Sequence, residues 1–257
     1  MIALLGNLAR DLFPGEPVAR PGGGPFHGAQ ALRRLSVAAE IYARCALEDR
    51  DALLPPLLSL GSPVHYVPGR ATASFAISEA GAERRMQVLA LGDTWLPSDI
   101  PELRPATRWI HVAPLLRNDF PAQTLAALAR GRRLSLDGQG LVRPARLGPL
   151  ELDAEYDPAL LREVTVLKLS DEEAEVLGDL AALRVPELLV THGAAGATVY
   201  AGGDVEEIPA TAIGGNHTGT GDAFSIAYLA ARSQGAPPGA AARQATALVA
   251  TLLAATP

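Results

Sequence analysis

The sequence predicts an α/β protein in which helices cover a mostly parallel central sheet. Beyond residue 105, short apolar segments alternate with helical ones, and this alternation is typical of strand–helix–strand units with right-handed crossovers. Three strand-like segments without intervening helices occupy roughly residues 62–92, and they indicate a small antiparallel patch attached to the main sheet, for which a surface hairpin without a closing role is the alternative. No repeat or low-complexity linker interrupts the chain, so we expect residues 1–257 to form one domain that includes this patch.

Composition excludes several classes of protein. Of the 257 residues, 48% are hydrophobic and 19% are charged, which is typical of a globular chain and not of a disordered or fibrous one. The formal net charge is −6 without a basic block, so we do not expect nucleic acid as a partner. The first apolar run is too short for a signal segment, and no run reaches the ~18 residues of a membrane span. Together with the single cysteine, Cys45, these features predict a cytoplasmic protein without membrane contact.

The N-terminal part begins with a strand and a glycine cluster. Residues 2–5 form an apolar run that ends at Gly6, as expected of a buried first strand. Asp11 follows where such a strand would deliver the chain to the carboxyl edge of the sheet, at which ligands bind in open α/β sheets. A role as a turn cap is the alternative for Asp11. The cluster at 21–27 precedes an expected helix, but it fits neither a dinucleotide fingerprint nor a P-loop.

Two later junctions join expected strands to polar or glycine-rich turns. The strand at 164–169 leads to Ser170-Asp171-Glu172-Glu173, which is a helix capping box and also places carboxylates where a hard cation such as Mg²⁺ can bind. The strand at 188–191 leads to His192-Gly193-Ala194-Ala195-Gly196, whose small residues suit either a hairpin turn or close approach to a ligand. Further strands are expected at 109–113 and 134–136, with a helix at 121–129 between them.

The strongest chemical signal lies between Gly214 and Phe224. Its glycines free the backbone to turn sharply, and a helical pattern follows that ends at Gly235. A glycine-rich turn that leads into a helix N-terminus binds anions, above all phosphate. The carboxylate of Asp222 would repel a bound anion, so we expect it to have a chemical role. Accepting a proton from an attacking hydroxyl is such a role. A turn without a ligand is the structural alternative.

At these residues the chain resembles a known family. The sequence Thr218-Gly219-Thr220-Gly221-Asp222-Ala223-Phe224 is similar to the C-terminal signature of the ribokinase / phosphofructokinase-B family of sugar kinases. The resemblance implies a ribokinase-like three-layer fold with a β lid. It also implies that Asp222 is the catalytic base and that the amides of Gly219, Thr220 and Gly221 form an anion hole for the transferring phosphoryl group.

The other matching blocks imply the remaining site residues. Acceptor binding is implied for Asp11, Gly22, Gly23 and His27, although His27 stands where the family usually has Asn. Contact with ATP is implied for Thr191, Gly193, Gly196 and Thr218, and orientation of Mg²⁺ for Glu173. Ser170 replaces the usual Asn of the metal motif, and Asn216-His217 replace the usual Asp-Thr, which leaves activation by potassium open.

The resemblance therefore implies an ATP-dependent kinase that phosphorylates a hydroxyl of a sugar, polyol or nucleoside, with ATP and Mg²⁺ as cofactors. Residues 136–140 with 168–173 look more like the branch that includes myo-inositol kinases. The competing hypotheses are a catalytically silent nucleotide- or sugar-binding member of the same fold and a kinase for a heterocyclic alcohol. An exposed lid edge makes a homodimer through the lid a further expectation.

Overall fold

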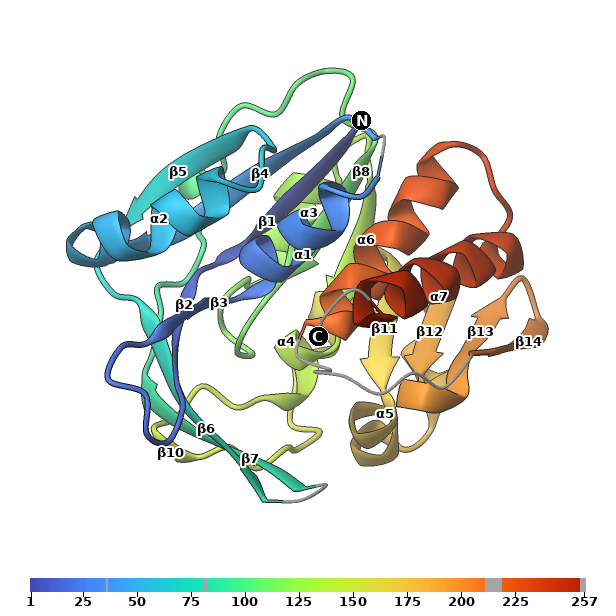
Figure 1. The fold of residues 1–257 in the computed structure, drawn as a ribbon. Helices are drawn as coiled ribbons and strands as arrows, with labels where there is room; N and C mark the ends of the chain where they lie inside the picture. Colours follow the sequence, from blue (N-terminus) through green and yellow to red (C-terminus); the bar gives the residue numbers. More distant parts are fainter. Residues whose placement is uncertain (36, 81–82, 211–218, 255–257) are drawn as a thin grey trace.

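The computed structural model describes residues 1–35, 37–80, 83–210 and 219–254, with the side chains of residues 79–84 excepted. Its main feature is a nine-stranded sheet (Figure 1). The strands of this sheet, in spatial order, are β14 (Asp204–Pro209), β13 (Gly196–Ala201), β12 (Glu187–Thr191), β11 (Val164–Ser170), β9 (Arg133–Asp137), β8 (Trp109–Ala113), β1 (Ile2–Asn7), β4 (Ala39–Ala46) and β5 (Val64–Gly69).

Seven of these strands, from β12 to β5, are parallel, and β13 and β14 add an antiparallel hairpin at one edge. Every residue of β1 and of β8 is buried, as expected for central parallel strands that are covered on both faces. Parallel strands end at the same edge of a sheet, so the residues that follow them are brought together there.

Helices cover both faces of the sheet (Figure 1). One face packs against α1 (Gly24–Leu32), α2 (Arg50–Leu58), α6 (Thr220–Ser233) and α7 (Pro238–Ala254). The other face packs against α3 (Ala122–Ala129), α4 (Gln139–Val142) and α5 (Asp171–Leu177). Short 3-10 helices lie at Leu47–Asp49, Pro97–Asp99, Pro158–Leu161, Leu180–Leu183 and Gly193–Ala195. The predicted three-layer α/β architecture is confirmed.

A second, smaller sheet lies beside the carboxyl edge of the main sheet. Its strands, in spatial order, are β10 (Gly148–Pro149), β7 (Glu83–Ala90), β6 (Ala73–Ala80), β2 (Ala9–Leu12) and β3 (Arg20–Gly22). The β6–β7 hairpin is antiparallel, whereas β2 and β6 run parallel. We call this five-stranded sheet the lid sheet. Its inner side chains, which include Phe75, Ile77 and Val88, form a separate apolar cluster with Leu116 from the loop after β8.

The lid sheet differs in one respect from the lid expected at roughly 62–92. The segment Val64–Gly69 is not part of it, because this strand pairs in parallel with β4 and forms an edge of the main sheet. The lid sheet instead recruits β2 and β3 from the N-terminal part of the chain. Within the described residues, none of the helices combines the length and the apolar character that a membrane crossing demands.

Candidate active site

A cavity of about 190 Å³ lies between the carboxyl edge of the main sheet and the lid sheet. Its polar wall brings together side chains from five separate segments, namely Asp11, His27, Lys168, Glu173 and Asp222. Four of these five were predicted site residues, and they come from positions up to 211 residues apart in the chain (222 − 11). The cavity is therefore the place where the sequence motifs meet.

Asp222 is a buried carboxylate in the first turn of α6, and its side chain lines the cavity. Burial raises the pKa of Asp222 to about 7, the nearby carboxylate of Asp137 adds to this rise, and Lys168 and Arg143 oppose it. Its Oδ1 is buried and has no hydrogen-bond partner among the described residues. A carboxyl group with a pKa near neutrality and a free acceptor oxygen is suited to general-base chemistry.

The backbone before Asp222 has the shape that the motif predicts. Gly219 is the N-cap of α6 with φ of 80°, in the left-handed region that favours glycine. A Cβ at this position would lie 2.5 Å from Nδ1 of His27, so a larger residue would clash as well as strain the backbone. Thr220 and Gly221 belong to the first turn of the helix, whose amides point out of its N-terminus and lie at its positive end. This geometry suits an anion.

The residues predicted to bind the acceptor lie on the same polar wall. Asp11 lies on β2 and is buried, and Gly22 on β3 packs directly against its carboxylate, since a Cβ at Gly22 would lie 2.2 Å from Oδ2 of Asp11. Gly23, with φ of 95°, is the N-cap of α1, and a Cβ there would meet the carbonyl oxygen of Asn7 at 2.3 Å. His27 follows in the first turns of the same helix. Glycine at 22 and 23 thus allows the chain to fold over the cavity.

The lid sheet closes the cavity with apolar side chains. Phe75 and Ile77 on β6 and Met86 on β7 line it, and Leu115 from the loop after β8 joins them. An apolar wall opposite a wall of carboxylates suits a ligand with many hydroxyl groups on its edge and C–H groups on its faces.

Glu173 is buried and its position is set by a capping box. Its backbone N–H donates to Oγ of Ser170 over 3.3 Å, and the backbone N–H of Ser170 donates to Oε2 of Glu173 over 2.9 Å. Burial raises the pKa of Glu173. The capping and the cation hypotheses are compatible, because only one carboxylate oxygen has a partner in the cap.

The described residues contain no cluster of three or more His, Cys, Asp or Glu side chains that could hold a metal ion. A magnesium ion keeps several waters and uses one or two carboxylates together with substrate phosphates, so it does not require such a cluster. Glu173 on the cavity wall therefore fits a cation held partly by water and phosphate, and it does not fit a cage made by the protein alone.

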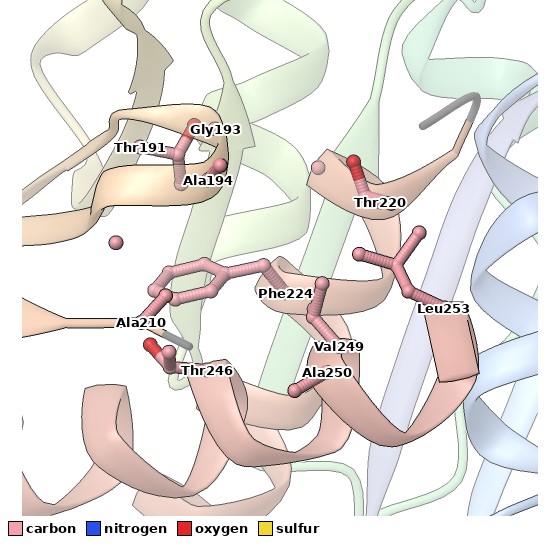
Figure 2. Close-up of a pocket in the computed structure, with 12 residues that line it drawn as sticks. Thr191, Gly193, Ala194, Ala210, Thr220, Phe224, Thr246, Val249, Ala250 and Leu253 are labelled. Atoms are coloured by element: carbon pink, nitrogen blue, oxygen red, sulfur yellow. The ribbon is translucent and has the colours of Figure 1, made fainter. Parts of the chain in front are cut away.

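A second cavity lies on the other side of the α6 N-terminus (Figure 2). It is lined by Thr191, Gly193 and Gly196, the predicted nucleotide-loop residues, and by Phe224 on α6 and Val249 on α7. Thr220 and Gly221 also line this cavity, and Gly221 borders the first cavity as well. Thr218, together with Asn216 and His217, lies outside the described residues.

The sequence interpretation missed Lys168 as a site residue. Lys168 lies on β11 beside Asp137 on β9, and its Nζ is 3.4 Å from Oδ2 of Asp137. Both side chains are buried. A lysine inside the apolar strand Val164–Ser170 was itself a signal of a buried charged group. Gln139 lies in the matching block 136–140 but was given no role there, and Arg143 and the apolar lid residues were missed because no motif includes them.

Comparison with known proteins finds curated relatives and many similar structures. No protein-family model matches the chain. One relative is an inositol 3-kinase from Zea mays, 29% identical over 196 residues, which are 74% of this chain and 50% of that protein. The chain thus spans about half the length of the curated relative that it matches.

Two solved structures illustrate the similarity of fold. One is a pyrophosphate-dependent kinase in the ribokinase family, complexed with a pyrophosphate analog and myo-inositol, with a TM-score of 0.86, 24% identity, and coverage of 100% of this chain and 96% of that one. The other is a nucleoside kinase from Burkholderia thailandensis in complex with ADP-inosine, with a TM-score of 0.72, 21% identity, and coverage of 99% and 89%. At these identities the likeness establishes the fold.

Proposed function

The chain has the fold of the ribokinase-family kinases, and from this premise we propose that it transfers a phosphoryl group from a phosphoanhydride donor to a hydroxyl group of a cyclic polyol. The observation that carries the proposal is Asp222: a buried carboxylate with a pKa of about 7 at the N-terminus of a helix, facing a cavity between the sheet edge and the lid sheet. Neither a plain turn nor a silent binding protein requires a carboxylate at an anion site.

Each proposed step uses a residue of the cavity. The acceptor oxygen attacks the terminal phosphorus of the donor, its proton passes to the carboxylate of Asp222, and the bond between that phosphorus and the bridging oxygen breaks. The negative charge that develops on the phosphoryl oxygens is held by the amides of Gly219, Thr220 and Gly221, and the loss of one such donor commonly costs ~3–4 kcal/mol of transition-state stabilisation.

For the acceptor we propose an inositol. The support is the name of the curated relative together with the chemistry of the cavity. Asp11 and His27 on one wall offer groups for the hydroxyls of a ring, and Phe75, Ile77 and Met86 on the other offer apolar contact to its C–H groups. Sugars and nucleosides share the hydroxyl edge, so they are the competing acceptors.

For the donor we propose ATP with Mg²⁺. The cavity between the loop after β12 and helix α7 lies next to the anion-binding turn, and its wall of small and apolar residues suits a nucleotide base. Glu173 would orient the magnesium ion through water, and the ion supplies charge neutralisation on the phosphates when bound. Pyrophosphate is the competing donor, because a similar solved kinase is described as pyrophosphate-dependent. We also propose a cytoplasmic location, in keeping with the free, buried thiol of Cys45.

The deciding experiment measures phosphorylated product with ATP or pyrophosphate as donor against inositols, pentoses, hexoses and nucleosides. We expect turnover of myo-inositol with Mg²⁺-ATP, and we expect Asp222→Asn to fold and to lose at least about 100-fold in kcat, in line with the usual contribution of a general base. Asp51→Asn, an exposed carboxylate on α2, is the matched control and should keep full activity. Turnover that Asp222→Asn leaves intact would disprove the role of Asp222. ATP-induced thermal stabilisation without turnover on any acceptor would favour the silent binder.

A further inference from the structure

We propose that the ammonium group of Lys168 binds the phosphoanhydride donor directly, beside the turn at residues 219–221, which we call the anion-binding turn. This inference rests on the proposed function in assuming a phosphate donor at the N-terminus of α6, and it assigns a ligand role to a residue to which the sequence motifs gave none. Lys168 is the only lysine of the chain.

The position of the ammonium group is the first argument. A Cβ at Gly221 would lie 2.8 Å from Nζ of Lys168, so the ammonium group lies immediately against the backbone of the turn whose amides face the anion. A side chain at 221 would therefore displace the lysine from its place beside the turn. The same side chain lines the cavity together with Asp222 and Glu173.

The charge of Lys168 is the second argument. Burial lowers the pKa of Lys168, but the carboxylates of Asp137, Glu173 and Asp222 outweigh burial and raise it overall, so the side chain is positively charged at neutral pH. The hydrogen bond to Asp137 uses one of its three N–H donors. The burial of an unpaired lysine costs folding free energy. Asp137 is the paired carboxylate, and the other N–H groups of Lys168 can donate to a second anion.

The simpler hypothesis is that Lys168 only neutralises Asp137. The two hypotheses differ in where the lysine is needed: a neutralising lysine affects stability, whereas a donor ligand also affects the affinity for phosphate. Truncation of Lys168 alone would leave Asp137 buried without a partner and could destabilise the fold. The double variant Lys168→Met with Asp137→Asn removes both charges at nearly constant shape and avoids this problem.

The binding test uses inorganic pyrophosphate with Mg²⁺ as the probe and calorimetry as the measurement. We expect Lys168→Met and the double variant each to weaken pyrophosphate binding by about 10- to 100-fold, the range of a hydrogen bond to a charged group. Arg162→Met, which removes an exposed positive charge far from the cavity, is the matched control and should leave the affinity unchanged. Affinity that is unchanged in the folded double variant would overturn the proposal, as would a wild-type protein that does not bind pyrophosphate.

A spectroscopic test uses the fact that the chain has one lysine. Labelling with [¹³Cε]lysine gives a single side-chain resonance, which we expect to move on titration with Mg²⁺-pyrophosphate. A resonance that stays in place while calorimetry shows binding would also overturn the proposal. Neither test requires turnover, so a Lys168-dependent affinity in a protein that phosphorylates no acceptor would refute the kinase function and leave the phosphate site standing.

Discussion

At the scale of single residues, Asp222 combines a cost in stability with a proposed role in chemistry. Its pKa of about 7 in the folded protein is above its ordinary value of 3.8, so the folded state binds the proton more tightly than the unfolded chain does. The contribution of this tighter proton binding to the free energy of unfolding is fully present below pH 3.8, and it is lost as the pH rises through about 7. Asp222 is therefore expected to destabilise the protein at alkaline pH.

The corresponding prediction concerns Asp222→Asn. Because Asn is neutral at every pH, we expect the substitution to raise the free energy of unfolding at pH 8, by up to about 4 kcal/mol, and by clearly less at pH 5. Denaturant titrations at the two pH values measure the difference. Equal effects at pH 5 and pH 8 would mean that the pKa of Asp222 is close to that of an exposed aspartate.

The sequence was informative about residues whose role depends on their neighbours in the chain. Gly219 was predicted at a turn before a helix, and the structure places it there with a positive φ. Lys168 and Asp137 were not predicted to meet, because their contact depends on the pairing of β11 with β9, which are 31 residues apart at this point. Sequence patterns indicate turns and helix ends, but they do not specify strand register between distant segments.

At the scale of secondary-structure elements, the start of α5 combines two functions in one motif. The side chains of Ser170 and Glu173 exchange hydrogen bonds with each other's backbone, and Glu173 also lines the cavity. The capping function and the proposed magnesium function can be separated by substitution, because they depend on different atoms.

We therefore predict opposite profiles for two variants. Ser170→Ala removes the acceptor for the amide of Glu173 and should lower the free energy of unfolding by about 1 kcal/mol. Glu173→Gln keeps a side-chain oxygen for the amide of Ser170 but loses the charge, so it should raise the Mg²⁺ concentration for half-maximal activity by about 10-fold with little loss of stability. Thermal unfolding and a magnesium titration of the rate provide the two measurements. A Glu173→Gln variant with an unchanged magnesium requirement would contradict the metal role.

Some elements escaped prediction because polar residues interrupt their apolar pattern. Strand β4 contains Glu40 and Arg44, both of which are needed for ion pairs: Glu40 with Arg104 over 2.8 Å, and Arg44 with Asp99 over 2.9 Å. The segment Val64–Gly69 has an alternating pattern that suits a lid, but it forms an edge strand of the main sheet, where one face is also exposed. Local pattern alone does not distinguish these two positions.

At the scale of the whole molecule, we propose that two copies of the chain associate through their lid sheets. Leu89 on the outer face of β7 is 44% exposed and lies on the sheet that would form the interface. Leu89→Asp is expected to convert a dimer of twice 26.7 kDa into a monomer, as measured by light scattering. Val205→Asp on β14, an apolar and more exposed position (62%) at the far edge of the main sheet, should leave the dimer intact. A wild-type protein that is monomeric at all concentrations would disprove the proposal.

The fold class was predictable because strand and helix patterns alternate along the whole chain. Which strands form the lid sheet was not predictable. Four of the five lid strands lie within the first 90 residues, yet β2 and β6 pair across 64 positions of sequence (73 − 9). Such a pairing depends on tertiary packing, and no local sequence pattern indicates it.

The two cavities meet at a single turn of backbone, since Gly221 borders both of them. For the proposed reaction we therefore expect a protein that binds both ligands at once and passes the phosphoryl group directly from donor to acceptor in a ternary complex. Its initial rates should give intersecting double-reciprocal lines, whereas a phosphorylated-enzyme intermediate would give parallel lines. Isotope exchange between the donor and its product should not occur when the acceptor is absent.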